Sequence, residues 1–258
     1  GGSMTLLETV AVAFSMFSAI PMPQFLWNEK NMRYALCAFP LIGGVVGGVC
    51  WGAWSICGLL GLPTLLRGAI LTLIPVLITG GIHLDGYSDT WDALASHASQ
   101  KKKQEILKDP HVGSFAVIRL CGYFVMNLTL WTALKTFPWA AVLLSFCMSR
   151  TLSGLAVASF PLAKHTGLAH TFAQAADKKR VRTVLIILDV LLCAGMCLCG
   201  YEGILMAAAA HAVFADYYRI SQKQFGGLSG DLAGWFLQTA ELWMLLVLVI
   251  LQYVEVLI

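Results

Sequence analysis

The sequence predicts an all-α fold, a polytopic integral membrane bundle of about seven or eight transmembrane helices. Of its 258 residues, 58% are hydrophobic and only 12% are charged, about half the charged fraction of a typical soluble domain. Its mean hydropathy is +0.75, and apolar runs recur near the length of about 20 residues that crosses a bilayer. We therefore expect residues 4–258 to form a single transmembrane domain in a lipid bilayer, and interpret residues 1–3 as the remnant of a cleaved tag.

Eight apolar segments are expected along the chain: 5–25, 35–60, 66–83, 112–134, 138–160, 183–200, 203–217 and 232–256. Pro21 and Pro23 interrupt the first segment. We therefore consider two alternatives for it, a full membrane span and a short or re-entrant helix. The sixth and seventh segments are short and are separated only by Tyr201 and Glu202. They are expected to form a tight helical hairpin.

Lysine and arginine decide the expected orientation. Most of the 17 such residues fall in loops 26–34, 84–111, 161–182 and 218–231, whereas only Arg67 and Lys135 lie in loops on the other side. Because basic loops stay in the cytoplasm, these four loops are expected there, together with any active site they carry. With eight spans, both termini lie outside. The net charge of +3 gives no indication of nucleic-acid binding.

Three aspartates follow the third apolar segment. Asp85, Asp89 and Asp92 are spaced at i, i+4 and i+7, so a helix would place them on one face. Carboxylates this close repel one another unless a cation gathers them, and Mg²⁺ binds such oxygens while bridging to phosphates. Acids that offset a helix dipole would explain one or two of them, but not three in register. The spacing therefore predicts an Mg²⁺ site that holds a diphosphate.

Two further segments are candidates for the same site. Lys108 and Asp109 precede a proline, which is typical of an N-cap opening the fourth span, and such a helix start is also a phosphate site. Ser229, Gly230 and Asp231 lie in a glycine-rich turn before the last span, where the backbone can approach a ligand closely. The alternative for the second segment is an ordinary turn with an N-capping aspartate.

His83 and Arg150 are candidates of a different kind. Imidazole is a poor ligand for Mg²⁺, so His83 is considered as a base, a phosphate donor or a structural hydrogen-bonding group. Arg150 is embedded in an apolar segment and is considered as a clamp on a diphosphate or as one half of a structural ion pair. Charges inside lipid must pair or face the bundle interior, and the candidate partners are Asp189, Asp216 and Glu241.

The eight cysteines also lie inside apolar segments. Three of them, Cys193, Cys197 and Cys199, form a cluster with no histidine near it in the sequence. Free thiols are therefore expected rather than a metal site or a disulfide.

At these motifs the chain resembles the cobalamin synthase family, the adenosylcobinamide-GDP ribazoletransferases. The family motif Gly-(Gly)-X-His-X-Asp-Gly-X-X-Asp-X-X-Asp-Gly matches residues 81–93, with Ala93 in place of the last glycine. Residues 17–23, 39–43, 108–115 and 227–231 resemble further family blocks in the same order, with Glu241 downstream. Ala19 replaces an arginine of the family, and Pro110 and His111 replace a serine and an arginine.

The resemblance implies a reaction at a diphosphate. The ribose hydroxyl of α-ribazole, or of its 5′-phosphate, attacks the corrinoid-side phosphorus of adenosylcobinamide-GDP, GMP leaves, and adenosylcobalamin or its 5′-phosphate forms. It also implies a single catalytic domain in the cytoplasmic membrane of a prokaryote, with the active site facing the cytoplasm. A homo-oligomer is compatible with the sequence.

The residues supply the groups that this reaction needs. Mg²⁺ would be held by Asp85, Asp89, Asp92 and Asp231, and either Asp92 or His83 would serve as the general base. The substrate-binding candidates are Lys108, Asp109, Arg150, Ser229 and Gly230, with Lys108 and Arg150 neutralising the diphosphate.

Two other classes of protein are considered. A CDP-alcohol phosphotransferase also uses spaced aspartates on a membrane helix, but that class has Ala-Arg after its first aspartate pair, where this chain has Ala93 and Leu94. A cation-coupled transporter predicts acids near mid-membrane and an internal repeat. Here the acids cluster at one interface, so both alternatives rank below the transferase.

Overall fold

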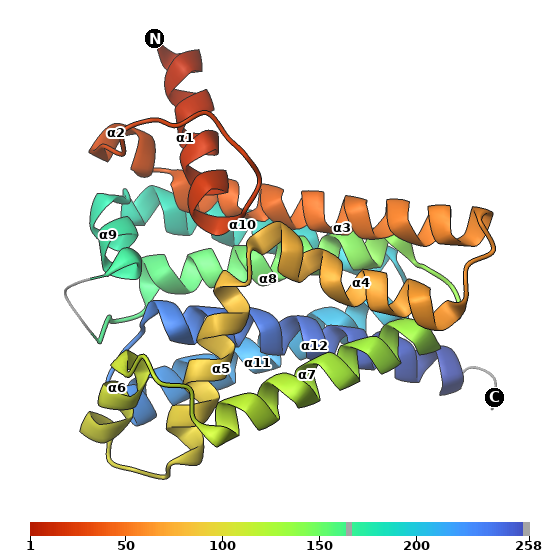
Figure 1. Cartoon of the computed structure of the whole chain (residues 1–258). Coiled ribbons are helices and arrows are strands. Elements are labelled where there is room, and N and C mark those ends of the chain that lie inside the picture. Colours follow the sequence, from red (N-terminus) through yellow and green to blue (C-terminus); the bar gives the residue numbers. More distant parts are fainter. Residues whose placement is uncertain (164–166, 255–258) are drawn as a thin grey trace.

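The computed structural model describes residues 1–163 and 167–254. Within these residues all the regular secondary-structure elements are helices (Figure 1). One isolated bridge joins Leu162 to Leu228. The helices are α1 (Gly2–Phe17), α2 (Glu29–Met32), α3 (Ala35–Leu59), α4 (Thr64–Thr79), α5 (Ile82–Ala95), α6 (Gln100–Lys108), α7 (Ser114–Ala133), α8 (Trp139–Ser159), α9 (Leu168–Ala175), α10 (Lys178–Leu198), α11 (Tyr201–Phe225) and α12 (Gly230–Val254).

The long helices lie alongside one another, whereas α1 and α5 run across them (Figure 1). Helix α8 is central and contacts α3, α10, α11 and α12. Its close approach to α3 depends on two glycines one turn apart, because a Cβ at Gly43 would lie 2.3 Å from the carbonyl oxygen of Phe146 and one at Gly47 would lie 2.7 Å from Cα of Leu143. Such pairs of small residues let membrane helices pack by van der Waals contact.

The all-helical membrane class is confirmed, but the expected number of spans is too high. By length and composition, five helices can cross a membrane, namely α3, α7, α8, α10 and α12, and the bent pair α4–α5 raises the number to six. Helix α1 is too short, since it ends at Phe17 before the two prolines. Helix α11 is long, but Glu202, His211 and Asp216 lower its hydropathy, so it does not qualify. The expected segment 232–256 ends two residues beyond the described part.

Helices α10 and α11 form the expected hairpin and are longer than predicted, with only Cys199 and Gly200 between them. Inside the hairpin, the Nε2 atom of His211 lies 2.8 Å from the Oδ2 atom of Asp189. Sγ of Cys193 lies 3.9 Å from the same nitrogen. The cysteine cluster therefore does have a histidine neighbour, which comes from a later helix and is invisible in the local sequence.

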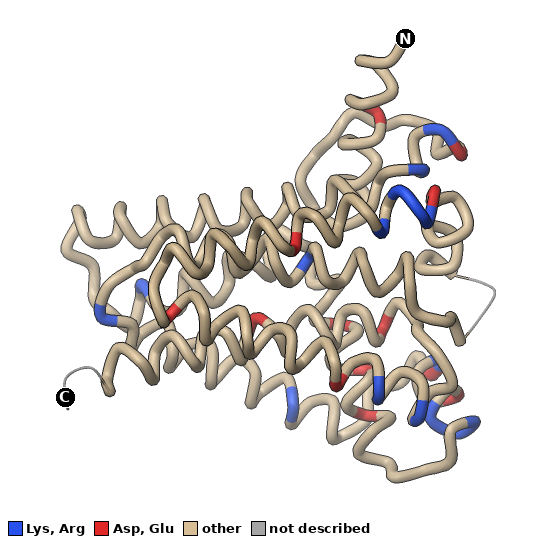
Figure 2. Tube along the Cα trace, turned by 180° about the vertical axis from the view of Figure 1, so that it is seen from behind, with Lys and Arg blue, Asp and Glu red and all other residues tan. Residues whose placement is uncertain are grey.

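Charged residues are concentrated at one end of the bundle. Figure 2 shows most lysines and arginines at the end where α2, α6 and α9 lie. At the opposite end, the guanidinium of Arg67 stacks 3.5 Å above the ring of Trp54, and Lys135 lies 4.0 Å above Tyr253. Lys164, another residue of the basic loops, lies outside the described residues.

A sharp bend separates α4 from α5. Gly80 and Gly81 have φ angles of 67° and 77°, a left-handed conformation that residues with a Cβ rarely adopt. The two helices are bent by 96° relative to each other. The third apolar segment thus ends at this glycine pair, and α5 crosses the end of the bundle instead of continuing along it (Figure 1).

Helix α5 then packs very closely against α12. A Cβ at Gly86 would lie 2.6 Å from the carbonyl oxygen of Asp231, and a Cβ at Gly234 would lie 2.5 Å from the carbonyl oxygen of His83. Both clashes are with backbone atoms, which cannot rotate away. Each helix therefore has a glycine where the other helix's backbone comes closest.

We expect Gly86→Ala to separate α5 from α12 and to lower stability by about 1–3 kcal/mol, as overpacking does. The measurement is thermal unfolding of the purified protein in detergent. Gly122→Ala is the matched control, because the added Cβ on α7 meets no atom within 4 Å and alanine favours a helix by up to about 1 kcal/mol. Equal melting temperatures for the two variants would contradict the close crossing.

Candidate active site

Three carboxylates converge where α5 crosses α12. One oxygen from each of Asp85, Asp89 and Asp231 lies within 4.8 Å of the others. Asp85 and Asp89 are one turn apart on α5, and Asp231 lies in the first turn of α12. Since Asp85 is also in a first turn, the positive ends of two helix dipoles offset part of the repulsion. The arrangement is an oxygen donor set of the kind that Mg²⁺ prefers.

Asp92 is placed differently from the other two aspartates of its motif. Its Oδ2 atom accepts a hydrogen bond from the backbone N–H of Gly113, 3.1 Å away. A Cβ at Gly113 would lie 2.2 Å from the other carboxylate oxygen, so Asp92 is packed against the start of α7. Among the described residues, the third member of the carboxylate group is Asp231, where the spacing alone suggested Asp92.

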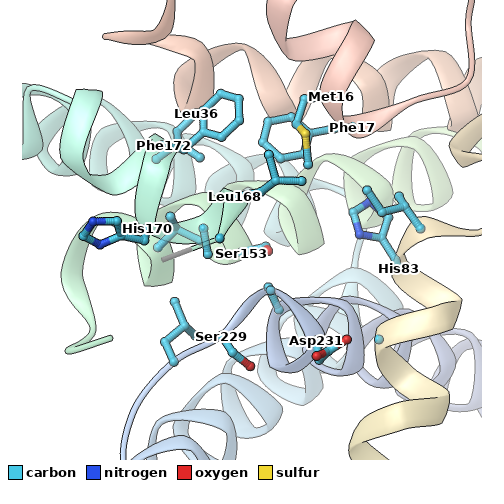
Figure 3. A pocket seen from close by; sticks show the side chains of 18 of the residues that line it. Met16, Phe17, Leu36, His83, Ser153, Leu168, His170, Phe172, Ser229 and Asp231 are labelled. Atoms are coloured by element: carbon cyan, nitrogen blue, oxygen red, sulfur yellow. The ribbon is translucent and has the colours of Figure 1, made fainter. Parts of the chain in front are cut away.

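A cavity of about 330 Å³ opens beside the carboxylates. Its volume falls in the range of about 300–1,000 Å³ that is typical of small-molecule sites. Figure 3 shows Phe17 and Phe172 on one side of it, and Ser229 and Asp231 on the opposite side. The cavity therefore has an apolar wall from α1, α3 and α9 and a polar edge at the α5–α12 crossing.

Two polar side chains at this edge are buried without a hydrogen-bond partner. Within residues 1–163 and 167–254, neither the Nε2 atom of His83 nor the Oγ atom of Ser229 has such a partner, although only 7% of His83 and 9% of Ser229 is exposed. Both residues line the cavity, and the His83 ring lies 5.7 Å from that of Phe39. A bound molecule that supplies partners to these atoms would remove the cost of leaving them unpaired.

Lys108 and Asp109 lie outside the cavity lining. Both are exposed at the end of α6, where Asp109 is the C-cap residue. The expectation that Asp109 opens the fourth span is wrong, because α7 begins at Ser114 with Gly113 as its N-cap. The backbone N–H of His111 donates to Oδ1 of Asp109 at 2.9 Å, and this hydrogen bond, with a second from the imidazole, lowers the pKa of Asp109.

Arg150 forms a buried ion pair with Glu241. Its Nη1 atom lies 2.7 Å from Oε1 of Glu241 and donates also to the carbonyl oxygen of Phe146 at 3.1 Å. The side chain is fully buried and is not part of the cavity lining. Of the two roles considered for Arg150, this geometry corresponds to the structural pair, which ties α8 to α12.

Comparison with known proteins identifies the family of this chain. The model of the cobalamin-5-phosphate synthase family matches residues 9–249. The chain belongs to this family. It is 44% identical to the adenosylcobinamide-GDP ribazoletransferase of Lachnoclostridium phytofermentans over 93% of this chain and 92% of that protein.

More distant relatives with the same name cover nearly as much of the chain. The protein of Geobacillus kaustophilus is 31% identical over 89% of this chain and 90% of its own length. That of Clostridium botulinum strain Alaska E43 is 29% identical over 92% and 95%. No solved structure matches the chain.

The glycine-rich block that matches the synthase family mostly serves backbone packing. A Cβ at Gly227 would lie 2.5 Å from the backbone nitrogen of Ala163, and Leu228 exchanges backbone hydrogen bonds with the 161–163 segment. Gly234 meets α5, as described above. Gly230 alone of these three lines the cavity and has free space where a Cβ would be. Close approach to a ligand therefore stays a prediction for Gly230 alone of these three glycines.

Sequence reasoning missed the apolar wall of the cavity. Leu168 and Phe172 come from α9, and Met16 and Phe17 come from the end of α1. None belongs to a motif with reactive side chains. The amphipathic pattern of α9 was the available signal, because Phe172 and Ala173 are buried whereas Thr171 and Gln174 are exposed. It identifies a buried face and not what that face encloses.

We expect Glu241→Ala to destabilise this synthase-family fold strongly, because it leaves the Arg150 guanidinium without a counter-charge. Loss of one partner of a buried pair costs about 3–5 kcal/mol, which lowers a melting temperature in detergent by about 10 °C. Arg219→Ala is the control, since its pair with Asp216 is exposed and such pairs contribute little. A melting temperature close to that of the control would contradict a stabilising role for the buried pair.

Proposed function

We propose that the chain is a membrane-bound adenosylcobinamide-GDP ribazoletransferase. It joins adenosylcobinamide-GDP with α-ribazole, or its 5′-phosphate, to give adenosylcobalamin, or its 5′-phosphate, and GMP. Family membership gives the reaction, and the observation that ties it to this chain is the carboxylate group of Asp85, Asp89 and Asp231 at the edge of a cavity. Phosphoryl transfer depends mainly on positioning and charge neutralisation, and an acidic edge of this kind is where a divalent cation would serve both.

Mg²⁺ is the cofactor that this donor set fits. Three carboxylates that face one another at close range need a counter-ion, and carboxylate oxygen is the preferred ligand of Mg²⁺. Asp85, Asp89 and Asp231 would hold it, and when bound it would neutralise charge on the diphosphate. Asp92 would not bind the cation directly. Its hydrogen bond with the N-cap residue Gly113 would tie α5, which carries Asp85 and Asp89, to the start of α7.

His83 is the better placed of the two candidates for the general base. The ribose hydroxyl forms a bond to the corrinoid-side phosphorus, the bond from that phosphorus to the GMP oxygen breaks, and the hydroxyl proton needs an acceptor. Nε2 of His83 has no hydrogen-bond partner in the described part of the chain, and His83 lines the cavity. The carboxylate of Asp92 is instead engaged by Gly113.

The orientation in the membrane is a second part of the proposal. The lysines and arginines gather at the end of the bundle that carries the carboxylates (Figure 2), and basic ends stay in the cytoplasm. The site would then face the cytoplasm of a prokaryotic cell. This arrangement gives GMP a direct exit to water.

The two alternatives have less support. The carboxylate group lies at one end of the bundle, whereas a cation-coupled transporter binds near mid-membrane. The pair of Asp189 and His211 is a further acidic position, and it lies apart from the cavity lining. A CDP-alcohol phosphotransferase is disfavoured by the family match over 9–249.

Asp231→Asn is expected to lower the turnover rate by about 100-fold or more. The amide removes one of the negative charges that would hold Mg²⁺, and the cation supplies the positive charge that the diphosphate needs. The melting temperature without Mg²⁺ should stay the same or rise, because repulsion among the carboxylates falls. The assay measures GMP released from adenosylcobinamide-GDP in the presence of α-ribazole and Mg²⁺. Asp216→Asn, on the exposed face of α11, is the matched control.

Two results of this assay would count against the proposal. If the wild-type protein makes no GMP and no adenosylcobalamin where a known ribazoletransferase does, the proposed function is wrong. If Asp231→Asn keeps a nearly normal rate, the carboxylate group has no part in the reaction.

For the orientation, we expect a cysteine introduced by Lys101→Cys to react with an impermeant maleimide only from the cytoplasmic side. Leu60→Cys, in the turn at the opposite end of the bundle, should react only from outside. The exposed native cysteines, Cys121 and Cys197, are first replaced by serine. Labelling of both introduced cysteines from the same side would reject the proposed topology.

A further inference from the structure

Apolar side chains form the wall of the cavity opposite the carboxylates. Leu36 and Phe39 of α3, Phe17 of α1, and Leu168 and Phe172 of α9 contribute to it. The Phe17 ring stacks on that of Phe39 with centroids 4.3 Å apart, and lies 5.4 Å from the ring of Phe172. Figure 3 shows this wall facing Ser229 and Asp231 across the cavity. A ligand here must be apolar on one side and polar on the other.

Guanine, the corrin ring and the diphosphate of the nucleotide substrate each fail to fit the apolar wall. Guanine has a carbonyl, a ring N–H and an amino group on its edges, and against Phe17, Leu168 and Phe172 these would lose their hydrogen bonds with water and gain none. A corrin ring with its amide side chains is far larger than a cavity of about 330 Å³. The diphosphate is excluded from the wall by its charge.

We propose that this cavity binds the benzimidazole base of α-ribazole and so sets the choice of acceptor base; the inference rests on the proposed function. A benzimidazole is flat, aromatic and without amino or carbonyl groups, so it can pack against Phe17, Phe39 and Phe172 by offset or edge contacts. The base enters the apolar side, which leaves the attached ribose at the polar edge.

The polar edge matches the rest of the acceptor. The Nε2 atom of His83 and the Oγ atom of Ser229 are buried at the cavity and have no hydrogen-bond partner among the described residues. They can bond the ribose hydroxyls or the one unsubstituted ring nitrogen. Asp85 and Asp231 line the same edge, so a ribose held there lies between the base pocket and the carboxylate group. The reacting hydroxyl is thereby directed to the diphosphate.

The test measures binding and turnover separately, with two acceptors. One is α-ribazole, and the other is the α-riboside of adenine, which adds ring nitrogens and an amino group. The wild-type protein in detergent should bind α-ribazole about 10- to 100-fold more tightly than the adenine riboside, because the side chains of Phe17, Leu168 and Phe172 offer the added polar groups no hydrogen-bond partner. This comparison needs no variant and is made by calorimetry.

Leu168→Asn places an amide in the wall at a half-exposed position where folding should tolerate it. We expect it to weaken α-ribazole binding about 10-fold and to reduce the ratio of the affinities for α-ribazole and the adenine riboside. The KM for adenosylcobinamide-GDP should be unchanged. The matched control is Leu26→Asn, because Leu26 is 92% exposed in the segment between α1 and α2 and lies outside the lining.

Three outcomes would overturn the inference: equal affinity of the wild type for the two acceptors, unchanged α-ribazole binding in Leu168→Asn, or a rise in the KM for adenosylcobinamide-GDP alone. The last would assign the cavity to the other substrate. Tight, selective binding of α-ribazole without release of GMP has a different meaning. It would support the base pocket and reject the proposed reaction, so the two failures are distinguishable.

Discussion

The active site depends on the crossing of α5 and α12, where the two backbones come so close that only glycine fits. Gly86 lies against the backbone of Asp231, and Gly234 lies against the backbone of His83. The contact is reciprocal, so it fixes both the separation of the helices and their relative position along the crossing. It brings Asp231 to the acids of α5 from a position about 145 residues later in the chain. It also sets His83 at the edge of the cavity.

A crossing that gathers three like charges needs support from elsewhere. The glycine bend after Thr79 turns α5 by 96° so that its first turn faces that of α12, and both helix dipoles then favour negative charge at the same place. Helix α12 is anchored about 15 Å further along, where Glu241 pairs with Arg150 of α8. The buried pair thus has no direct role at the cavity, but it holds one side of the crossing in place.

The local sequence predicted which segments supply acidic side chains to the site better than it predicted how these side chains are arranged. The spacing of Asp85 and Asp89 correctly placed them on one face of a helix, and the glycine-rich turn correctly brought Asp231 to a helix start. The same spacing could not separate Asp92 from its neighbours, because its partner is a backbone N–H at Gly113, a contact between distant segments. The predicted count of spans is too high because α1 ends at Phe17 and lies across the bundle, and because the polar residues of α11 keep it from qualifying as a span. The apolar wall was missed for a similar reason, since its residues come together only in three dimensions.

The combination of apolar wall and acidic edge also bears on why this site would transfer rather than hydrolyse. A cavity of about 330 Å³ has room for about ten waters at ~30 Å³ each, and water is a competing nucleophile at a diphosphate. An acceptor base that fills the apolar side displaces those waters and places its ribose hydroxyl at the edge in the same step. Water exclusion also strengthens the interactions of charges at Asp85 and Asp231. Binding energy from the base, which takes no part in the bond changes, would then be used to orient the hydroxyl, as remote binding energy is in other enzymes.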